Sequence, residues 1–161
     1  MKNISIITDG SCDIPKEVIE QYQIKLLPLH FQFEDQIEYG SERIMDIEDF
    51  YRRLENGEVA KTSACSPSSA IEIMKKELDK GNDVICVTIS SSMSCTFNNI
   101  RLASLELQDS YPEQRITVID SLTASMAMGM MVIKACTMRD EKYSYDQIVE
   151  YLEENKQSFH V

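Results

Sequence analysis

The sequence predicts an α/β fold, in which a mainly parallel sheet lies between two layers of helices. Two short apolar runs, at 4–8 and 83–89, have the composition of strands that are buried on both faces, and a third run, at 115–120, also predicts a strand. Each run precedes a segment with helical periodicity, and strands that alternate with helices imply right-handed crossovers between parallel strands. The 161 residues suffice for one domain with a hydrophobic core.

The first strand leads through a turn into a helix. Asp13 is expected to cap this helix, because an aspartate side chain can accept a hydrogen bond from a free N–H of the first turn. Pro15 suits that turn, and Val18, Ile19 and Tyr22 share one helical face.

A second strand is predicted over residues 24–33, where Pro28 indicates an edge or a bulge. Residues 35–40 are expected to return as a hairpin. Apolar residues at helical spacing predict a helix over about 46–55, and residues 56–66 are predicted to form a loop.

The middle of the chain has clear helix boundaries. Ser66 is a predicted N-cap with Pro67 in the first helical position, and Gly81 is expected to end that helix. The central strand follows, and a helix of roughly 95–107 comes after it.

The last third contains two further helices. Residues 121–138 are apolar nearly all round, which predicts a mostly buried helix. Ser144 is expected to cap a final amphipathic helix of about 145–156, and residues 159–161 resemble the start of another strand.

Charge excludes several function classes. The chain has 27 acidic and 16 basic residues, a net charge of −11, which disfavours binding to nucleic acid or to an anionic membrane. The longest apolar run, 126–133, is too short to span a bilayer, so no stable membrane insertion is expected.

Cysteine usage indicates a reducing compartment. The five cysteines form no C-x-x-C pair, and with only two histidines they do not predict a metal site. Asp9 interrupts the first apolar run, so no signal peptide is predicted, and a cytoplasmic location is expected.

Small polar side chains gather where strands end, at the edge where such sheets bind ligands. These groups are Asp9 and Ser11, then Thr62 and Ser63, then Ser90, Ser91, Ser94, Cys95 and Thr96, and finally Asp120, Ser121, Thr123 and Ser125. Each group opens onto a helix, whose free N–H groups favour an anion. The alternative is that these residues are ordinary caps and turn formers, although residues 90–96 carry more hydroxyls than one cap can use.

A carboxylate suits this neutral edge better than a phosphate chain. Neither G-x-G-x-x-G nor G-x-x-x-x-G-K-[ST] occurs, and only Lys61 is near in the sequence. A carboxylate held without salt bridges needs apolar burial for affinity. Met126, Met128, Met130 and Met131 follow at the same edge and could supply it, although core packing is the alternative explanation for them.

Five motifs in the right order resemble the DegV family of fatty-acid-binding proteins. They are ITDGSCDIP (7–15), IKLLPLHFQFEDQIEYG (24–40), TSACSP (62–67), ISSSMSCT (89–96) and VIDSLTASMAMG (118–129). The resemblance covers most of the chain. It implies a cytoplasmic carrier without its own chemistry, which binds a long-chain fatty acid and presents it to a separate fatty-acid kinase.

The resemblance also implies the site residues. Thr62, Ser63 and Ser94 would hold the carboxylate, and the backbone amides of the 91–95 loop, which includes Ser91 and Cys95, would assist. Asp9, Ser11, Ser121 and Ser125 are secondary candidates from the neighbouring strand ends. No cofactor or metal is implied.

Two departures from the family pattern stand out. Cys95 replaces a glycine, which matters if the position needs a positive φ or a close backbone approach. Residues 1–161 also correspond to the amino-terminal domain alone, without the second domain that covers the lipid in this family. Apolar surface is therefore expected to be exposed, and the chain could pair with a second copy through it.

The alternative function is a small hydrolase or a phosphoryl-handling enzyme at the same edge. Ser94 or Cys95 as nucleophile would need His30 or His160 within hydrogen-bond reach. A metal-dependent route would use Asp9 and Asp120, which could instead accept hydrogen bonds from loop N–H groups.

Overall fold

A computed structural model of the chain describes residues 3–40 and 43–159. Within these residues the main sheet has four parallel strands in the spatial order β2-β1-β6-β7. The strands are β1 (Ile4–Asp9), β2 (Lys25–Leu27), β6 (Asp83–Thr88) and β7 (Ile116–Asp120). The three apolar runs thus form β1, β6 and β7, and the predicted parallel α/β fold is confirmed.

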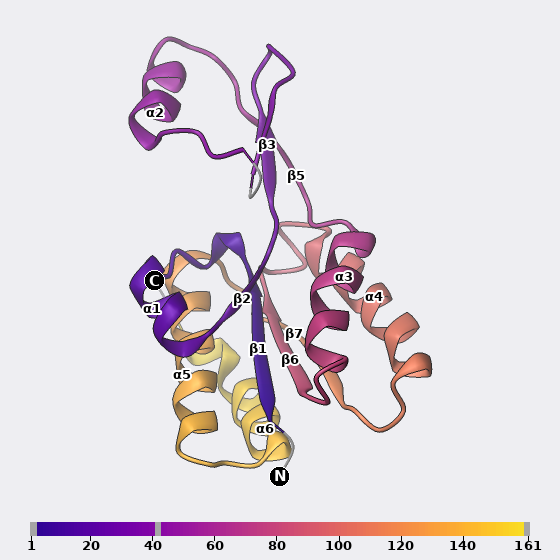
Figure 1. Cartoon of the computed structure of the whole chain (residues 1–161). Helices are drawn as coiled ribbons and strands as arrows, with labels where there is room; N and C mark the ends of the chain where they lie inside the picture. The colour runs from indigo at the N-terminus through magenta and orange to yellow at the C-terminus, as the bar shows by residue number, and fades with distance from the viewer. Residues whose placement is uncertain (1–2, 41–42, 160–161) are drawn as a thin grey trace.

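Helices cover both faces of this sheet, which gives three layers (Figure 1). The layer on one face contains α1 (Lys16–Tyr22), α5 (Ser125–Asp140) and α6 (Tyr145–Asn155), and the layer on the other contains α3 (Pro67–Leu78) and α4 (Thr96–Ser110). Neighbouring strand residues alternate between two cores, since Ile6 packs with α5 and α6 whereas Ile7 packs with α3 and α4.

A small antiparallel sheet stands beyond the carboxyl ends of the main strands (Figure 1). Its strands are β3 (His30–Gln32), β4 (Glu38–Tyr39) and β5 (Lys61–Ser63), in the order β4-β3-β5. Helix α2 (Ile47–Glu55) packs on one face of it through Phe50, whose ring centroid lies 5.1 Å from that of Phe31 and 5.7 Å from that of Phe33.

The single strand predicted over residues 24–33 is wrong, because the chain leaves the main sheet at Pro28. The segment before Pro28 forms β2 and the segment after it forms β3 of the small sheet. The predicted loop 56–66 contains a strand, because β5 pairs with β3 in antiparallel register, with Thr62 opposite Phe31. The hairpin predicted over 35–40 is confirmed by the pairing of β4 with β3.

Two helix starts also differ from the prediction. Asp13 has a left-handed backbone conformation and does not cap α1, whose N-cap is Pro15. Helix α5 begins at Ser125 rather than at residue 121, because Leu122 has a φ of 59° that interrupts helical geometry. The predicted caps Ser66 and Ser144 are confirmed. The strand predicted at 159–161 falls largely on residues outside the described part of the chain.

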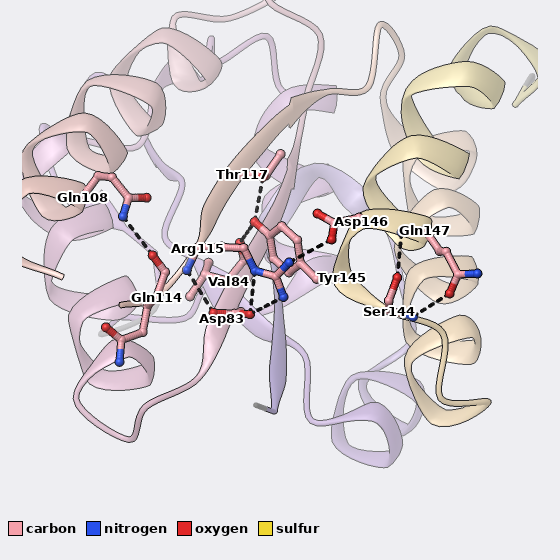
Figure 2. Close-up of polar contacts among 10 residues, drawn as sticks. All are labelled: Asp83, Val84, Gln108, Gln114, Arg115, Thr117, Ser144, Tyr145, Asp146 and Gln147. Carbon is pink, nitrogen blue, oxygen red and sulfur yellow. Dashed lines mark hydrogen bonds and ion pairs between the residues drawn. The ribbon is translucent and has the colours of Figure 1, made fainter. Parts of the chain in front are cut away.

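A polar network closes the opposite, amino-terminal edge of the main sheet. Asp83 is 1% exposed, and Arg115 donates to its carboxylate from Nε (3.0 Å), Nη2 (2.7 Å) and its backbone N–H (2.9 Å). Figure 2 shows Arg115 reaching Asp146 as well, while the Tyr145 hydroxyl lies between Val84 and Thr117. A cavity of about 960 Å³ at this edge is lined largely by charged side chains, which makes it unsuitable for an alkyl chain.

Candidate functional site at the carboxyl edge of the sheet

Two carboxylates join the loops at the carboxyl edge. Asp9 is fully buried at the end of β1 and accepts hydrogen bonds from the N–H of Ser11 (3.0 Å) and of Ile89 (2.8 Å). Asp120, at the end of β7, accepts from the N–H of Ser91 and of Leu122, both at 3.1 Å. The interpretation that these aspartates bind loop N–H groups is therefore confirmed.

Several predicted hydroxyls already have partners inside the protein. Ser121 is fully buried, and its Oγ donates to the carbonyl of Thr123 (3.0 Å) and accepts from the Thr123 N–H (3.2 Å). Ser125 donates to Oδ2 of Asp13, and Ser11 donates to Asp9. The secondary candidates Asp9, Ser11, Ser121 and Ser125 thus stabilise the loops through their side chains.

The segment that carries Thr62 and Ser63 lies against the start of α4. Thr96 is fully buried, and its Oγ1 accepts a hydrogen bond from the N–H of Cys65 (3.3 Å). Asn99 donates from Nδ2 to the carbonyl of the same Cys65 (2.9 Å). Two segments that lie about thirty residues apart in the sequence are thereby held side by side.

The primary candidates differ in how far their hydroxyls are engaged. Thr62, Ser63 and Ser91 are exposed, and among the described residues no side chain or backbone group hydrogen-bonds to their hydroxyls. Ser94 is half-buried, and its Oγ accepts a hydrogen bond from the N–H of Thr96 (3.1 Å). The hydroxyls of Ser94 and Thr96 also form a hydrogen bond with each other (2.9 Å).

Thr62 and Ser63 follow one another in β5, and successive strand residues point to opposite faces. The register places Thr62 opposite Phe31 and Ser63 opposite His30. Directly opposite residues share a face of a sheet, so Thr62 lies on the face that Phe31 turns toward α2. Ser63 lies on the opposite face, with His30.

Four of the five amides of the 91–95 loop are already bonded within the protein. The N–H groups of Ser91 to Ser94 donate to Asp120 or to Ser90. Among the described residues, those of Cys95, Phe97 and Asn98 have no acceptor. The available N–H donors are therefore that of Cys95, the last residue of the 91–95 loop, and those of Phe97 and Asn98 in the first turn of α4.

Cys95 does not occupy a position that requires glycine. Its φ is −71° and its ψ is −4°, which any L-residue adopts easily, and its thiol is exposed. The thiol of Cys65, by contrast, is buried. Burial, with the nearby charge of Asp9, raises the pKa of this thiol to about 11. Cys65 is therefore neutral at physiological pH.

Exposed apolar side chains border this edge. Met126 and Met130 are 41% and 42% exposed, whereas Met128 and Met131 are fully buried in the core between the sheet and α5. The core-packing explanation therefore holds for only half of these methionines. Met93 in the hydroxyl-rich loop is 66% exposed.

Thr96 and Asn99 were not singled out by the sequence as site residues. Thr96 is part of the hydroxyl-rich run and Asn99 follows it by one helical turn, but nothing local indicates that both bind Cys65. Over residues 3–40 and 43–159, no group of three or more His, Cys, Asp and Glu side chains is placed to hold a metal ion. In the same part of the chain, no helix is long and apolar enough to cross a membrane.

Comparison with known proteins gives a consistent result. The family model described as uncharacterised protein, DegV family, matches residues 3–161. A DegV domain-containing protein of Clostridium perfringens is 37% identical over 155 residues, which cover 94% of this chain and 52% of the relative.

Solved structures share the fold. The structure of DegV from Bacillus subtilis, described as a fatty acid binding protein, superimposes with a TM-score of 0.82 at 29% identity, covering 98% of this chain and 55% of that one. A stearic acid-binding protein from Eubacterium ventriosum gives a TM-score of 0.85 at 25% identity, covering 95% of this chain and 52% of that one. This chain spans about half the length of the relatives that it matches. With a family model that matches nearly all of its residues, the chain belongs to the DegV family.

Proposed function

We propose that the chain binds a long-chain fatty acid, with the carboxylate at the carboxyl edge of the sheet. The observation that carries the proposal is a rim of uncharged hydrogen-bond donors beside exposed methionines. Among the described residues, the hydroxyls of Thr62, Ser63 and Ser91 and the N–H groups of Cys95, Phe97 and Asn98 have no partner, while the Ser94 hydroxyl is hydrogen-bonded to Thr96. Related proteins that are described as fatty acid binding support the choice of ligand.

The chemistry of the rim suits one carboxylate. Hydroxyl and amide groups donate to carboxylate oxygens, and the N-terminal end of α4 contributes a favourable dipole. No Lys or Arg side chain takes part in the hydrogen bonds described at this edge, so the headgroup alone gives modest affinity. Burial of the alkyl chain, at about 25 cal/mol per Å² of apolar surface, would supply most of the binding free energy.

The exposed apolar side chains support the proposal that more protein covers the site. Ile47, Tyr51 and Leu54 of α2 are 62%, 57% and 38% exposed, in addition to Met126 and Met130. In this proposal residues 1–161 are the amino-terminal domain, and a second domain, or a second copy of the chain, covers the alkyl chain. The whole protein would be a cytoplasmic carrier that presents the carboxylate to a fatty-acid kinase.

The enzymatic alternative has less support. Ser94 forms its side-chain hydrogen bonds with Thr96, and His30 lies opposite Ser63 on β3, with its Nδ1 3.5 Å from Glu38. A serine nucleophile needs a base that is hydrogen-bonded to it. His160 lies outside the described residues. The proposal therefore assigns binding rather than catalysis to this edge.

The test is titration of the purified chain with monomeric oleate by isothermal titration calorimetry. Ser94→Ala should lower the affinity roughly tenfold, because one hydrogen bond to a charged group is lost. Ser110→Ala, at the far end of α4, is the matched control and should bind as the unchanged chain does. Oleyl alcohol, which lacks the carboxylate, should bind more weakly than oleate.

Two results would contradict the proposal. Equal affinity of Ser94→Ala and the unchanged chain for oleate would exclude the assigned headgroup site. Equal binding of oleate and oleyl alcohol would show that the carboxylate is not recognised at all.

A further inference from the structure

Both backbone groups of Cys65 are bound by one turn of α4. Its N–H donates to Oγ1 of Thr96 at 3.3 Å, and its carbonyl accepts from Nδ2 of Asn99 at 2.9 Å. Cys65 is fully buried and lies beyond the last residue of β5, so these groups have no partner in a sheet. Buried backbone groups need hydrogen bonds, and here the side chains of α4 supply them.

Capping of α4 does not account for these contacts. The N-cap of α4 is Cys95, and Thr96, the first residue of the helix, makes no cap hydrogen bond with its side chain. The Thr96 hydroxyl is instead directed across to Cys65, while it also contacts the Ser94 hydroxyl at 2.9 Å. Asn99 lies one turn further along the helix on the same side, since residues three apart are neighbours on a helix surface.

We propose that Thr96 and Asn99 are positioning residues for the carboxylate site. They hold β5 beside the start of α4, and so set the distance between Ser94 and whichever of the Thr62 and Ser63 hydroxyls lies on the headgroup side of the strand. This inference rests on the proposed function, because the carboxylate is what the two groups share. The hydrogen bonds between Cys65 and α4 also maintain the arrangement without ligand.

The test compares Thr96→Val, which keeps the shape of the side chain and removes Oγ1, with Thr96→Ser, which keeps Oγ1. In Thr96→Val the affinity for oleate, measured by calorimetry, should fall about tenfold, as expected when donors move out of place. In Thr96→Ser the affinity should return to within about twofold of the unchanged chain. Asn99→Leu should weaken oleate binding to an extent similar to that in Thr96→Val.

A control separates positioning from general stability. Ile100→Val removes one buried methylene from the same helix and leaves both hydrogen bonds to Cys65 in place. It should lower the melting temperature and leave the affinity for oleate unchanged. A loss of affinity in Ile100→Val equal to that in Thr96→Val would overturn the proposal, because it would show that stability alone controls binding.

Amide hydrogen exchange tests the hydrogen bonds without any ligand. The Cys65 amide should exchange at least tenfold faster in Thr96→Val than in the unchanged chain, with the amides of β6 unaffected. Unchanged exchange at Cys65 would refute the role of Thr96. If the unchanged chain fails to bind oleate but the exchange rates change as expected, the proposed function is wrong and the positioning of the two segments stands.

Discussion

Replacing Arg115 with Met measures the contribution of the buried ion pair at the amino end of β6. The carboxylate of Asp83 is 1% exposed, and the three hydrogen bonds that it accepts all come from Arg115. In Arg115→Met the backbone N–H remains, but two charge-assisted bonds disappear and a buried carboxylate loses its counter-ion (Figure 2).

The expected cost follows from the geometry of the pair. Removing one partner of a buried pair typically costs about 3–5 kcal/mol. The Arg115 side chain is 50% exposed, so water can partly solvate the carboxylate, and the lower end of that range applies. The guanidinium also lies 4.1 Å from the ring centre of Tyr145, a contact worth about 0.5 kcal/mol. The total is about 3.5 kcal/mol, or roughly 7–14 °C in melting temperature for a domain of this size.

Urea denaturation followed by circular dichroism is the assay. Asp146→Asn is the control, because Asp146 is 82% exposed and its pair with Arg115 should contribute less than about 0.5 kcal/mol. The double variant Asp83→Asn with Arg115→Met should recover more than half of the loss, since no buried charge remains. The reasoning would be refuted if Arg115→Met cost no more than Asp146→Asn.

Three further predictions concern packing, thiols and pH. Gly129→Ala should lower the free energy of unfolding by about 1 kcal/mol, because the new Cβ would lie 2.6 Å from the Cys12 carbonyl and outweigh the gain in helix propensity; a stabilised variant in urea denaturation would contradict this. N-ethylmaleimide should modify one thiol of the native chain, that of Cys95, and all five after unfolding, as counted by mass spectrometry; fast modification of a second thiol would contradict the described burial. Burial raises the pKa of Tyr145 to about 12 and that of Cys65 to about 11. The folded chain therefore holds these protons more tightly than the unfolded chain, and stability should fall as the pH rises above about 9 toward 12; stability that increases over this range in urea titrations would show the opposite linkage.

Local sequence signals predicted the elements that are stabilised by contacts within a few residues or by burial of apolar side chains. The β-branched runs of β1 and β6 have the composition of strands buried on both faces and form the two central strands, whereas β7 lies at the end of the described strand order and is only partly buried. Ser66 and Ser144 cap helices through bonds to residues three positions away, which a short motif can encode. The gathering of polar side chains at one edge was predictable for a similar reason, because the carboxyl ends of parallel strands always share one edge.

Non-local pairing decided the features that the sequence alone did not indicate. Residues 61–63 of the predicted loop 56–66 form a strand because they hydrogen-bond to β3. The strand predicted over 24–33 divides at Pro28 because β2 and β3 belong to different sheets. The free hydroxyls could not be identified from composition, since Ser121 and Ser91 have the same chemistry and differ only in their surroundings.

The sequence by itself determined the parallel α/β architecture, the order of its elements and the edge at which polar groups gather. The tertiary structure decided which of those groups remain available and how they are spaced. The physical reason is that hydrogen bonds between distant segments, such as those from α4 to Cys65, depend on how the helices pack on the sheet and leave no pattern in the local sequence.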